Sequence, residues 1–393
     1  MSIYRIFICA AAVIIALLGP LSAGGTAEDR VDMTCLNIGK ADCVILRAGG
    51  RAFLIDAGYE QTYPALGTAL NEMGITALDG VFLTHCHADH QGGIMPLALS
   101  SLPVGNWYAS GIYYNTNTQD HPILRAAEAR GTQPVFLSSG DRIIISDGMW
   151  FDVLGPLTAD TENENNNSLV MRFVSPFGSI LLTGDMKLEE EASLIGAGLL
   201  QASDVLKCGH HGDNKATGDA LLSVVRPRVA LISTSTPEEP DTPAKSTLKR
   251  LNAMGCAVYV TQDAQDAWRV VMDAQGVRVE DVTWRKIPAK VEGIVMTIET
   301  EDDVLSLLNT GSTAVRLDGA ALYSTRGNEL LYPADMVLEP GVPYLIGSGK
   351  TKTHRCDQIL DDKRIWHKSK LDIAVLYDAW GRPIAACGNG MED

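Results

Sequence analysis

Apolar positions in the first two thirds of the chain fall into short runs that predict a layered α/β structure. Residues 31–46 hold two strand-like runs around a turn, and residues 51–56 form a third that ends before an Ala-Gly pair. Residues 63–73 have helical spacing, and the glycine that follows suits the C-terminal end of a helix. Strand and helix patterns alternate in this way to about residue 285, as in sheets covered by helices.

The pattern changes after residues 284–293, which contain Pro288 and few apolar anchors. Beyond this segment, Gly and Asn turns separate short strand-like runs, a series that predicts a small all-β sandwich. These runs cover residues 294–298, 304–308, 314–317, 329–332, 342–346, 374–377 and 383–386. A chain of 393 residues is long enough for two cores. We therefore expect two domains, at residues 28–285 and 290–393.

The N-terminal segment, residues 1–27, has the pattern of an export signal. Arg5 gives a weakly positive start, residues 6–18 are continuously apolar, and small residues offer cleavage sites after Ala23 or Ala27. This apolar segment is short for a membrane span, and no later segment is apolar enough to cross a bilayer. We expect a cleaved signal and a secreted or cell-surface protein, with an uncleaved anchor or a lipid-attached form as the alternative.

The overall charge narrows the range of functions. The chain has 32 basic and 48 acidic residues, giving a formal net charge of −16, and 46% of its residues are hydrophobic. The apolar share is that of a globular protein. A general nucleic-acid-coating protein is disfavoured, because such proteins bind through a basic surface. An enzyme that meets phosphates through metal ions is not excluded by this charge.

The segment most indicative of chemistry is residues 84–90, which read Thr-His-Cys-His-Ala-Asp-His. It follows an apolar run that should end a strand at Thr84, so its potential ligands lie on the loop that leaves the sheet. Those ligands are His85, His87, Asp89 and His90. Imidazole and carboxylate groups suit zinc or a similar divalent ion. Two such ions about 3.5–4 Å apart generate a hydroxide nucleophile near neutral pH. The alternative is a histidine-rich surface loop.

Three further motifs favour the metal interpretation. Asp185 ends the apolar strand at residues 180–185, where a carboxylate can bridge two metals. A second strand ends in the paired residues His210 and His211, and amide and hydroxyl groups at residues 165–168 precede another strand. Each motif alone has a capping or turn explanation. Their occurrence together in this order is hard to attribute to chance.

With these motifs the chain resembles the metallo-β-lactamase-fold hydrolases, in particular the soluble hydrolase domain of DNA-uptake competence proteins of the ComEC type. The likeness covers roughly residues 30–275. The shared patterns are Leu-Thr-His-x-His-x-Asp-His-x-Gly-Gly at 83–93, Asn-Asn-x-Ser-Leu-Val at 165–170, Leu-Leu-Thr-Gly-Asp at 181–185 and Asp-Val-Leu-Lys-x-x-His-His-Gly at 204–212.

The chain also departs from the family pattern. The family's opening Leu-Asp-Val-Gly-Gln-Gly-Asp reads Leu-Asn-Ile-Gly-Lys-Ala-Asp at residues 36–42, so Lys40 stands at the position of glutamine. The proline common inside the first metal motif is Cys86. A Gly-His-Pro often found before a late helix is Asp-Thr-Pro at 241–243, which removes a possible active-site histidine.

The resemblance implies an αββα sandwich, in which two mixed sheets are flanked by helices and the metals lie at one edge. One metal would take His85, His87 and Asp185. The other would take Asp89, His90, Asp185 and one histidine of the later pair; His211 is favoured, and the reverse assignment stays open. Zinc is favoured and manganese is the alternative.

The resemblance also implies roles in catalysis. Asp89 and Asp185 would hold the attacking hydroxide between the metals. His210 would orient the substrate or protonate the leaving group. Asn167 and Ser168 would position a phosphate through hydrogen bonds.

Residues 290–393 resemble the lamin-tail domain, an immunoglobulin-like β-sandwich. Basic residues gather in this otherwise acidic chain at positions 350, 352, 355, 363, 364, 368 and 370. They could contact a phosphate backbone or an acidic surface polymer, and an ordinary solvated face is the alternative.

Three functional hypotheses follow. The first is an exported metal-dependent phosphodiesterase, in particular a nuclease acting on DNA or RNA. The second keeps this chemistry but assigns phosphorylcholine esters or other small phosphodiesters as substrates. The third is a surface-binding protein whose hydrolase domain is inert. A β-lactamase is disfavoured, because the motif set resembles that of enzymes acting on phosphoesters.

Overall fold

The computed structural model describes residues 14–16, 30–100, 102–112, 121–284, 293–324, 329–331, 333–368, 372–378 and 383–388. The chain divides into two compact units. The first comprises Met1–Tyr59, Ile75–Ile94 and Pro103–Thr283, and the second comprises Glu60–Gly74, Met95–Leu102 and Trp284–Asp393. The boundary predicted between residues 285 and 290 falls outside the described residues, so the predicted domain limits stay a prediction. Of the predicted signal, only Ile14–Ala16 is described.

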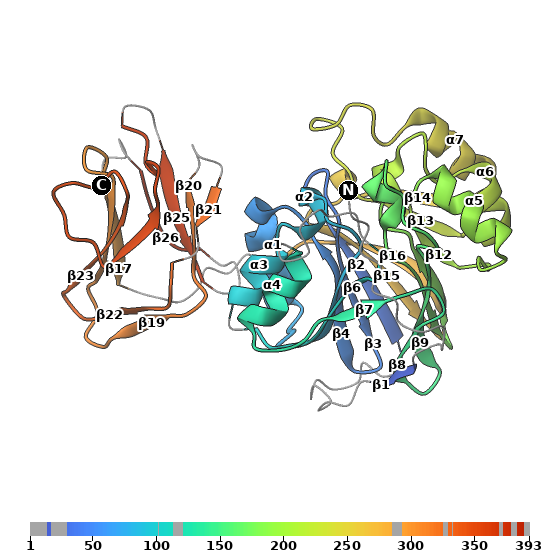
Figure 1. Ribbon diagram of the computed structural model, residues 1–393, viewed down its shortest axis with the longest axis horizontal. Helices are drawn as coiled ribbons and strands as arrows, with labels where there is room; N and C mark the ends of the chain where they lie inside the picture. Colours follow the sequence, from blue (N-terminus) through green and yellow to red (C-terminus); the bar gives the residue numbers. More distant parts are fainter. Residues whose placement is uncertain are drawn as a thin grey trace. The chain divides into compact units, whose positions relative to one another are not determined.

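The first unit contains two mixed eight-stranded sheets (Figure 1). The first sheet has the order β1 (Ile14–Ala16), β8 (Arg142–Ser146), β9 (Met149–Gly155), β10 (Val170–Ser175), β11 (Gly178–Leu182), β12 (Val205–Lys207), β13 (Val229–Ile232) and β14 (Ala257–Val260). The second has the order β16 (Gly276–Val282), β15 (Ala267–Asp273), β2 (Arg30–Leu36), β3 (Cys43–Ala48), β4 (Arg51–Ala57), β5 (Leu78–Leu83), β6 (Val104–Ser110) and β7 (Val135–Leu137). Neighbours from β11 to β14, and from β4 to β7, are parallel.

Alternation along each strand sends side chains to two different cores. Ile180 and Leu182 of β11 belong to the core between the two sheets, whereas Leu181 between them belongs to a second core on the other face. In the first core, Phe53 of one sheet packs edge to face against Phe151 of the other, with their ring centroids 5.4 Å apart. Burial on both faces explains why these strands are almost continuously apolar.

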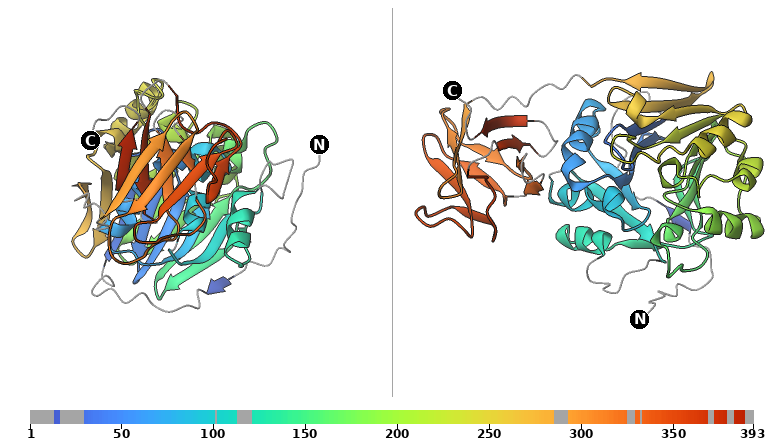
Figure 2. Two further views of the ribbon diagram at one scale, coloured as in Figure 1. Left: turned by 90° about the vertical axis from the view of Figure 1, so that its left-hand side faces the viewer. Right: turned by 90° about the horizontal axis from the view of Figure 1, so that it is seen from above.

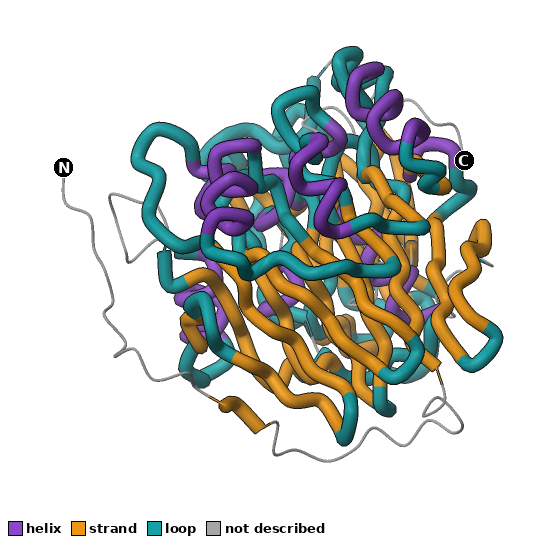
Figure 3. Tube along the Cα trace, turned by 90° about the vertical axis from the view of Figure 1, so that its right-hand side faces the viewer, coloured by secondary structure: helices purple, strands orange, loops and turns teal. Residues whose placement is uncertain are grey.

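Helices cover the outer face of the first sheet. α5 (Leu188–Gly196), α6 (Asp219–Val225) and α7 (Lys245–Ala253) supply Leu194, Leu222 and Leu251 to the second core. Figure 2 shows these helices along the outer side of that sheet, and Figure 3 shows its strands side by side. On the second sheet, α4 (Pro122–Ala129) packs against β6. The predicted α/β arrangement, with two mixed sheets flanked by helices, is therefore confirmed.

The remaining helices are short. The first unit also contains α2 (Ala88–Gln91) and the 3-10 turns η4 (Glu164–Asn167), η5 (His210–Gly212) and η6 (Thr261–Asp263). η2 (Glu60–Thr62) and α1 (Tyr63–Glu72) belong to the second unit, and α3 (Ile94–Leu99) belongs to it apart from its first residue. Within the described residues, no helix is both long enough and apolar enough to cross a bilayer.

Beyond residue 293 every described element is a strand. One sheet has the order β17 (Ile294–Glu299), β18 (Val304–Asn309), β23 (Pro343–Ser348) and β24 (Gln358–Asp361). A pair joins β19 (Val315–Leu317) to β22 (Met336–Leu338), and a third sheet has the order β21 (Glu329–Leu331), β20 (Ala321–Ser324), β25 (Ile373–Tyr377) and β26 (Pro383–Gly388). Trp366, Leu305 and Leu376 lie in one buried core shared by these strands. The predicted all-β character of this region is confirmed, and its likeness to a lamin-tail domain stays an expectation.

His121 makes the stability of the first unit depend on pH. It is the N-terminal cap of α4, where its Nδ1 accepts a hydrogen bond from the backbone N–H of Ile123 at 3.2 Å. Burial lowers the pKa of His121 to about 4. An unfolded histidine titrates near 6.5, so between these values the unfolded chain binds more protons than the folded one. Stability conferred by the neutral cap is therefore lost as the pH falls from about 6.5 towards 4.

We expect His121→Asn to remove this dependence, because asparagine also caps helices and does not titrate. Lowering the pH from 7 to 5 should cost the wild type about 2 kcal/mol more than the variant. Urea unfolding of both proteins at the two pH values measures this difference, and the comparison cancels the contribution of the other histidines. An equal pH response in the two proteins would contradict the assignment.

Candidate metal centre

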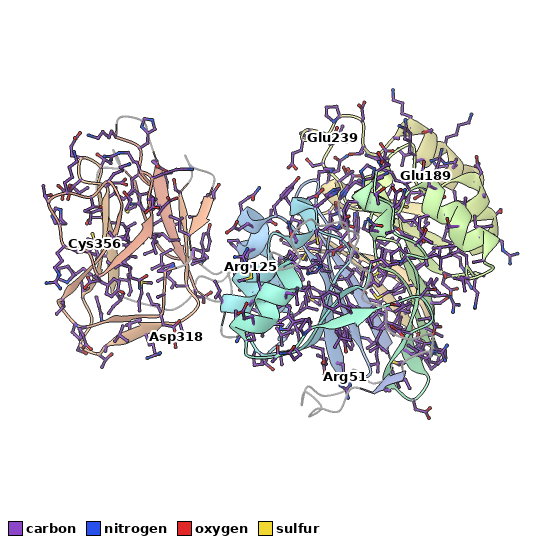
Figure 4. The ribbon with its side chains drawn as sticks, viewed as in Figure 1. Arg51, Arg125, Glu189, Glu239, Asp318 and Cys356 are labelled. Carbon is purple, nitrogen blue, oxygen red and sulfur yellow. The ribbon has the colours of Figure 1, made fainter. Side chains whose placement is uncertain are left out.

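The predicted ligands gather where parallel strands end at one edge of the sheets. Thr84 and His85 follow β5, Asp185 follows β11, and the His210–His211 pair follows β12. Asp56, near the end of β4, lies at the same edge. In Figure 4, Arg51 marks the start of β4 at the opposite end of the unit, and Glu239 marks the loop beside the site. Carboxyl ends of parallel strands commonly form ligand sites, because the loops that leave them converge.

A left-handed turn separates the roles of the two adjacent histidines. His210, His211 and Gly212 have φ values of 45°, 53° and 77°. Two successive non-glycine residues in this region are unusual. The turn is closed by hydrogen bonds from Gly212 N to Gly209 O and from Asp213 N to His210 O. As a result, His211 is fully buried, whereas the side chain of His210 keeps 22% of its surface exposed.

Asp185 lies at the centre of the cluster. Its Oδ1 is 3.3 Å from His90 Nε2, and its Oδ2 is 3.4 Å from His211 Nε2 and 3.9 Å from His85 Nε2. His211 Nε2 is also 3.2 Å from Asp89 Oδ2. His87 is exposed, and its Nδ1 lies 3.0 Å from His85 Nε2. His210 Nε2 is 3.9 Å from Asp185 Oδ2. The geometry thus favours His211 over His210 as the ligand.

These separations fit the requirements of divalent cations. Two nitrogen or oxygen ligands at about 2.1 Å from a tetrahedral ion stand about 3.4 Å apart, close to most of the distances above. Three atoms that face this volume are buried without a hydrogen-bond partner: His90 Nε2, His211 Nε2 and Asp185 Oδ1. Buried polar atoms rarely lack partners, and those that do require an explanation. Cations bound between these atoms would satisfy them, so the residues present fit a metal centre.

Groups behind the histidines leave their ligand nitrogens facing the cluster. His90 Nδ1 contacts Asp56 Oδ2 at 2.8 Å, and His211 Nδ1 contacts the carbonyl oxygen of Ser233 at 2.8 Å. Both partners are acceptors, so each Nδ1 carries the proton and each Nε2 is free to bind a metal. Asp56 is itself fixed by the backbone N–H and hydroxyl of Thr84, each at 2.8 Å.

The carboxylates and imidazoles shift one another's pKa values. Burial would raise the pKa of Asp185, but His211 and His90 lower it well below its ordinary range. Burial would likewise lower the pKa of His211, but Asp185 and Asp89 raise it to about 9. The pKa of His210 is lowered, chiefly by burial, so this imidazole is neutral at neutral pH. The carboxylates of the cluster are therefore stabilised by positive charge. Divalent cations would supply that charge in place of the protons on the imidazoles, and those protons would be released.

Asn167 and Ser168 are both buried, and they make different contacts. The Asn167 amide donates to Asp160 O and Glu164 Oε2, both at 2.9 Å, and its Oδ1 accepts from Asp160 N at 2.8 Å. In this structure Asn167 therefore holds its own loop together. Ser168 Oγ accepts a hydrogen bond from the backbone N–H of Asp185 at 3.0 Å and lies 3.4 Å from His85 Nδ1. Its contacts are with two candidate ligands, and the predicted contacts of both residues with substrate stay predictions.

The sequence interpretation missed the residues that support the ligands. Asp56 precedes an Ala-Gly pair at the end of a strand, the same signal that singled out Asp185. Lys207 interrupts an apolar strand, and its buried ammonium group donates to Asp42 Oδ2 at 2.7 Å. Asp42 Oδ1 lies 3.8 Å from His211 Nδ1. Lys40 contacts Asp89 directly, at 2.9 Å between Nζ and Oδ2.

Fold, ligand set and sequence agree on one class of protein. The chain belongs to the metallo-beta-lactamase superfamily, whose family model matches residues 36–236. Proteins of this fold bind divalent metals, typically two. The site described above lies within the matched residues.

Curated relatives connect the chain to the ComEC-like competence proteins. It is 28% identical over 268 residues to competence protein ComA of Neisseria gonorrhoeae, covering 66% of this chain and 36% of that protein. It is 31% identical over 231 residues to ComE operon protein 3 of Bacillus subtilis, covering 53% of this chain and 28% of that protein. The chain thus matches only about a third of the length of these relatives. Among solved structures, the diiron β-hydroxylase CmlA of Streptomyces venezuelae aligns with a TM-score of 0.42 and 14% identity, over 65% of this chain and 55% of that one.

Proposed function

We propose that this protein is an exported metal-dependent phosphodiesterase that hydrolyses DNA or RNA. The observation that carries the proposal is the cluster around Asp185, in which five buried side chains with metal-ligand chemistry face one small volume and the exposed His87 lies beside one of them, His85. The five buried residues are His85, Asp89, His90, Asp185 and His211. The relationship to the ComEC-like proteins supports nucleic acid as the substrate, because one of these relatives is named a competence protein.

Each residue of the cluster has a distinct role in the proposed reaction. Two divalent ions, zinc or manganese, would supply a nucleophile at neutral pH and neutralise charge on the phosphate. Asp89 and Asp185 hold the reacting centre from the buried side, while the partly exposed His210 faces the substrate side. A neutral imidazole at this position can hydrogen-bond to the phosphate or relay a proton to the leaving group. Ser168 holds Asp185 and His85 in position through its contacts with the backbone N–H of Asp185 and the ring of His85.

Export and surface binding form the second part of the proposal. We infer that residues 1–27 direct export and that the C-terminal β-region acts as a lamin-tail-like binding module. Arg364 and Lys368 are partly engaged with their own domain, since Lys368 Nζ pairs with Glu301 Oε2 at 2.8 Å and Arg364 Nη2 donates to Glu301 O. Of the basic group, Lys370 lies outside the described residues; among those described, Lys350, Lys352, Arg355 and Lys363 are exposed and could contact a phosphate backbone or an acidic polymer.

A metal-reconstituted activity panel tests the proposal. The purified chain, supplied with zinc or manganese, is offered DNA, RNA, a phosphorylcholine ester, bis(p-nitrophenyl) phosphate and a chromogenic β-lactam. We expect cleavage of nucleic acid and of bis(p-nitrophenyl) phosphate, and loss of both after chelation. Hydrolysis of small phosphodiesters with intact nucleic acids would identify a small-ester phosphodiesterase instead. No turnover, with retained binding to DNA or cell wall, would support a binding protein with an inert hydrolase domain.

A further inference from the structure

Lys40 places an ammonium group against a carboxylate of the candidate metal centre. Its Nζ donates to Asp89 Oδ2 at 2.9 Å, and the same oxygen lies 3.2 Å from His211 Nε2. A lysine stands here where the ComEC-type pattern has an uncharged glutamine.

The backbone fixes the position of Lys40. Gly39 has a φ of 83°, a conformation that residues with a Cβ rarely adopt, so the turn favours glycine at this position. Glu238 Oε2 accepts a hydrogen bond from Lys40 N at 2.8 Å. Two residues later, Asp42 N donates to Asp89 O at 3.0 Å. The Lys40 side chain therefore extends from a turn that is held by hydrogen bonds to Glu238 and to the backbone of Asp89.

Lys40 differs from the buried Lys207 in its access to solvent. The side chain of Lys207 is 2% exposed and donates to Asp42 Oδ2 and Cys208 O, so it is held inside the protein. The side chain of Lys40 is 22% exposed, while its partner Asp89 is 8% exposed. Lys40 thus lies at the rim, where an ammonium group can meet both the buried carboxylate and a ligand entering from solvent.

Two physical arguments assign a ligand to this position. If Asp89 Oδ2 binds a divalent cation, the Lys40 ammonium is repelled from that oxygen and needs another acceptor within reach of its flexible stem. A phosphodiester at the centre carries a negative charge and presents non-bridging oxygens, which accept strong charge-assisted hydrogen bonds. An uncharged ester or amide offers no such charge.

We propose that Lys40 is a substrate-binding residue whose ammonium group holds a non-bridging oxygen of the scissile phosphodiester. This inference rests on the proposed function and specifies it further: the site selects anionic phosphodiesters through a cation supplied by the chain itself. The bond is formed with the substrate in place, so its loss affects both diester binding and turnover, without changing the number of bound metals.

The test compares Lys40→Gln, which installs the family residue, with Lys40→Arg, which keeps the charge. Lys249→Gln, an exposed position on α7, is the matched control. Calorimetry measures binding of a non-hydrolysable phosphorothioate dinucleotide to the metal-loaded proteins. Mass spectrometry measures their metal content, and kcat/KM is measured on bis(p-nitrophenyl) phosphate. We expect Lys40→Gln to weaken dinucleotide binding and lower kcat/KM by about 10- to 100-fold. Lys40→Arg should retain most of both, and metal content should not change.

The outcomes separate this inference from the proposed function. An active wild type, with unchanged dinucleotide binding in Lys40→Gln, overturns the role of Lys40 and leaves the proposed function standing. An additional metal ion bound by Lys40→Gln also overturns it, because lysine would then be occupying a metal position. A wild type that binds the dinucleotide but cleaves no phosphodiester overturns the proposed function, while the binding comparison still tests Lys40.

Discussion

Replacing Asp185 with asparagine should reduce phosphodiester hydrolysis by about 10³-fold or more, equivalent to about 4 kcal/mol of activation free energy. Both carboxylate oxygens of Asp185 face ligand nitrogens, at 3.3 Å from His90 Nε2 and 3.4 Å from His211 Nε2. Asparagine has nearly the same shape but no charge, and its NH₂ group cannot bind a cation. We expect bound metal to fall from two ions per chain to one or none, measured by mass spectrometry beside the rate.

The matched control is Asp147→Asn, which removes a carboxylate from the exposed turn between β8 and β9. It should leave metal content and rate unchanged. Because Asp185 N donates to Ser168 Oγ through the backbone, that hydrogen bond survives the substitution and the loop should keep its conformation. An Asp185→Asn protein that retained two metals and the wild-type rate would exclude Asp185 as the shared ligand.

Replacing Lys207 with methionine should lower the free energy of unfolding by about 3–5 kcal/mol, as is typical when one partner of a buried ion pair is removed. The side chains of Lys207 and Asp42 are 2% and 3% exposed, and their charged atoms lie 2.7 Å apart. Methionine fills the space of the lysine stem but leaves the carboxylate of Asp42 buried without its cation. Urea unfolding at fixed metal concentration measures the loss.

A second variant separates loss of the ion pair from loss of packing. In Asp42→Asn with Lys207→Met both charges are absent, so we expect the double variant to be about 1–3 kcal/mol more stable than Lys207→Met alone. Lys249→Met, on the exposed surface of α7, should change stability by less than about 0.5 kcal/mol. Asp42→Asn alone completes the comparison: if the effects of Asp42→Asn and Lys207→Met simply added in the double variant, the two residues would not be energetically coupled.

The ends of strands, and the side chains that directly follow them, could be predicted from the local sequence. The candidate ligands at residues 84–90 follow a strand within a single turn, and the structure ends β5 at Leu83, one residue before the predicted end. Asp185 and His211 were predicted as ligands because each follows a buried apolar strand, and parallel strands bring their ends to one edge, where the structure places both side chains. Short-range patterning was enough for these assignments, since each depends only on where one strand stops.

Long-range pairs were not predictable in the same way. Lys207 and Asp42 are 165 residues apart, and their pairing requires both sheets to be packed against each other. Asn167 illustrates a different difficulty, because its sequence context suits a ligand contact as well as a loop contact. The backbone of Asp160 and the side chain of Glu164 engage its amide, and no spacing rule indicates this. In the sequence, Lys40 stood out only as a departure from a family pattern. Its contact with Asp89 became apparent only in the structure.

The central claim is that Asp185 is shared by two cations at the edge of the sheets. Anomalous diffraction from crystals grown with zinc tests it most directly. The account predicts two peaks about 3.5–4 Å apart, with the Asp185 carboxylate within about 2.2 Å of both. A single peak away from Asp185, or none at this edge of the sheets, would contradict it.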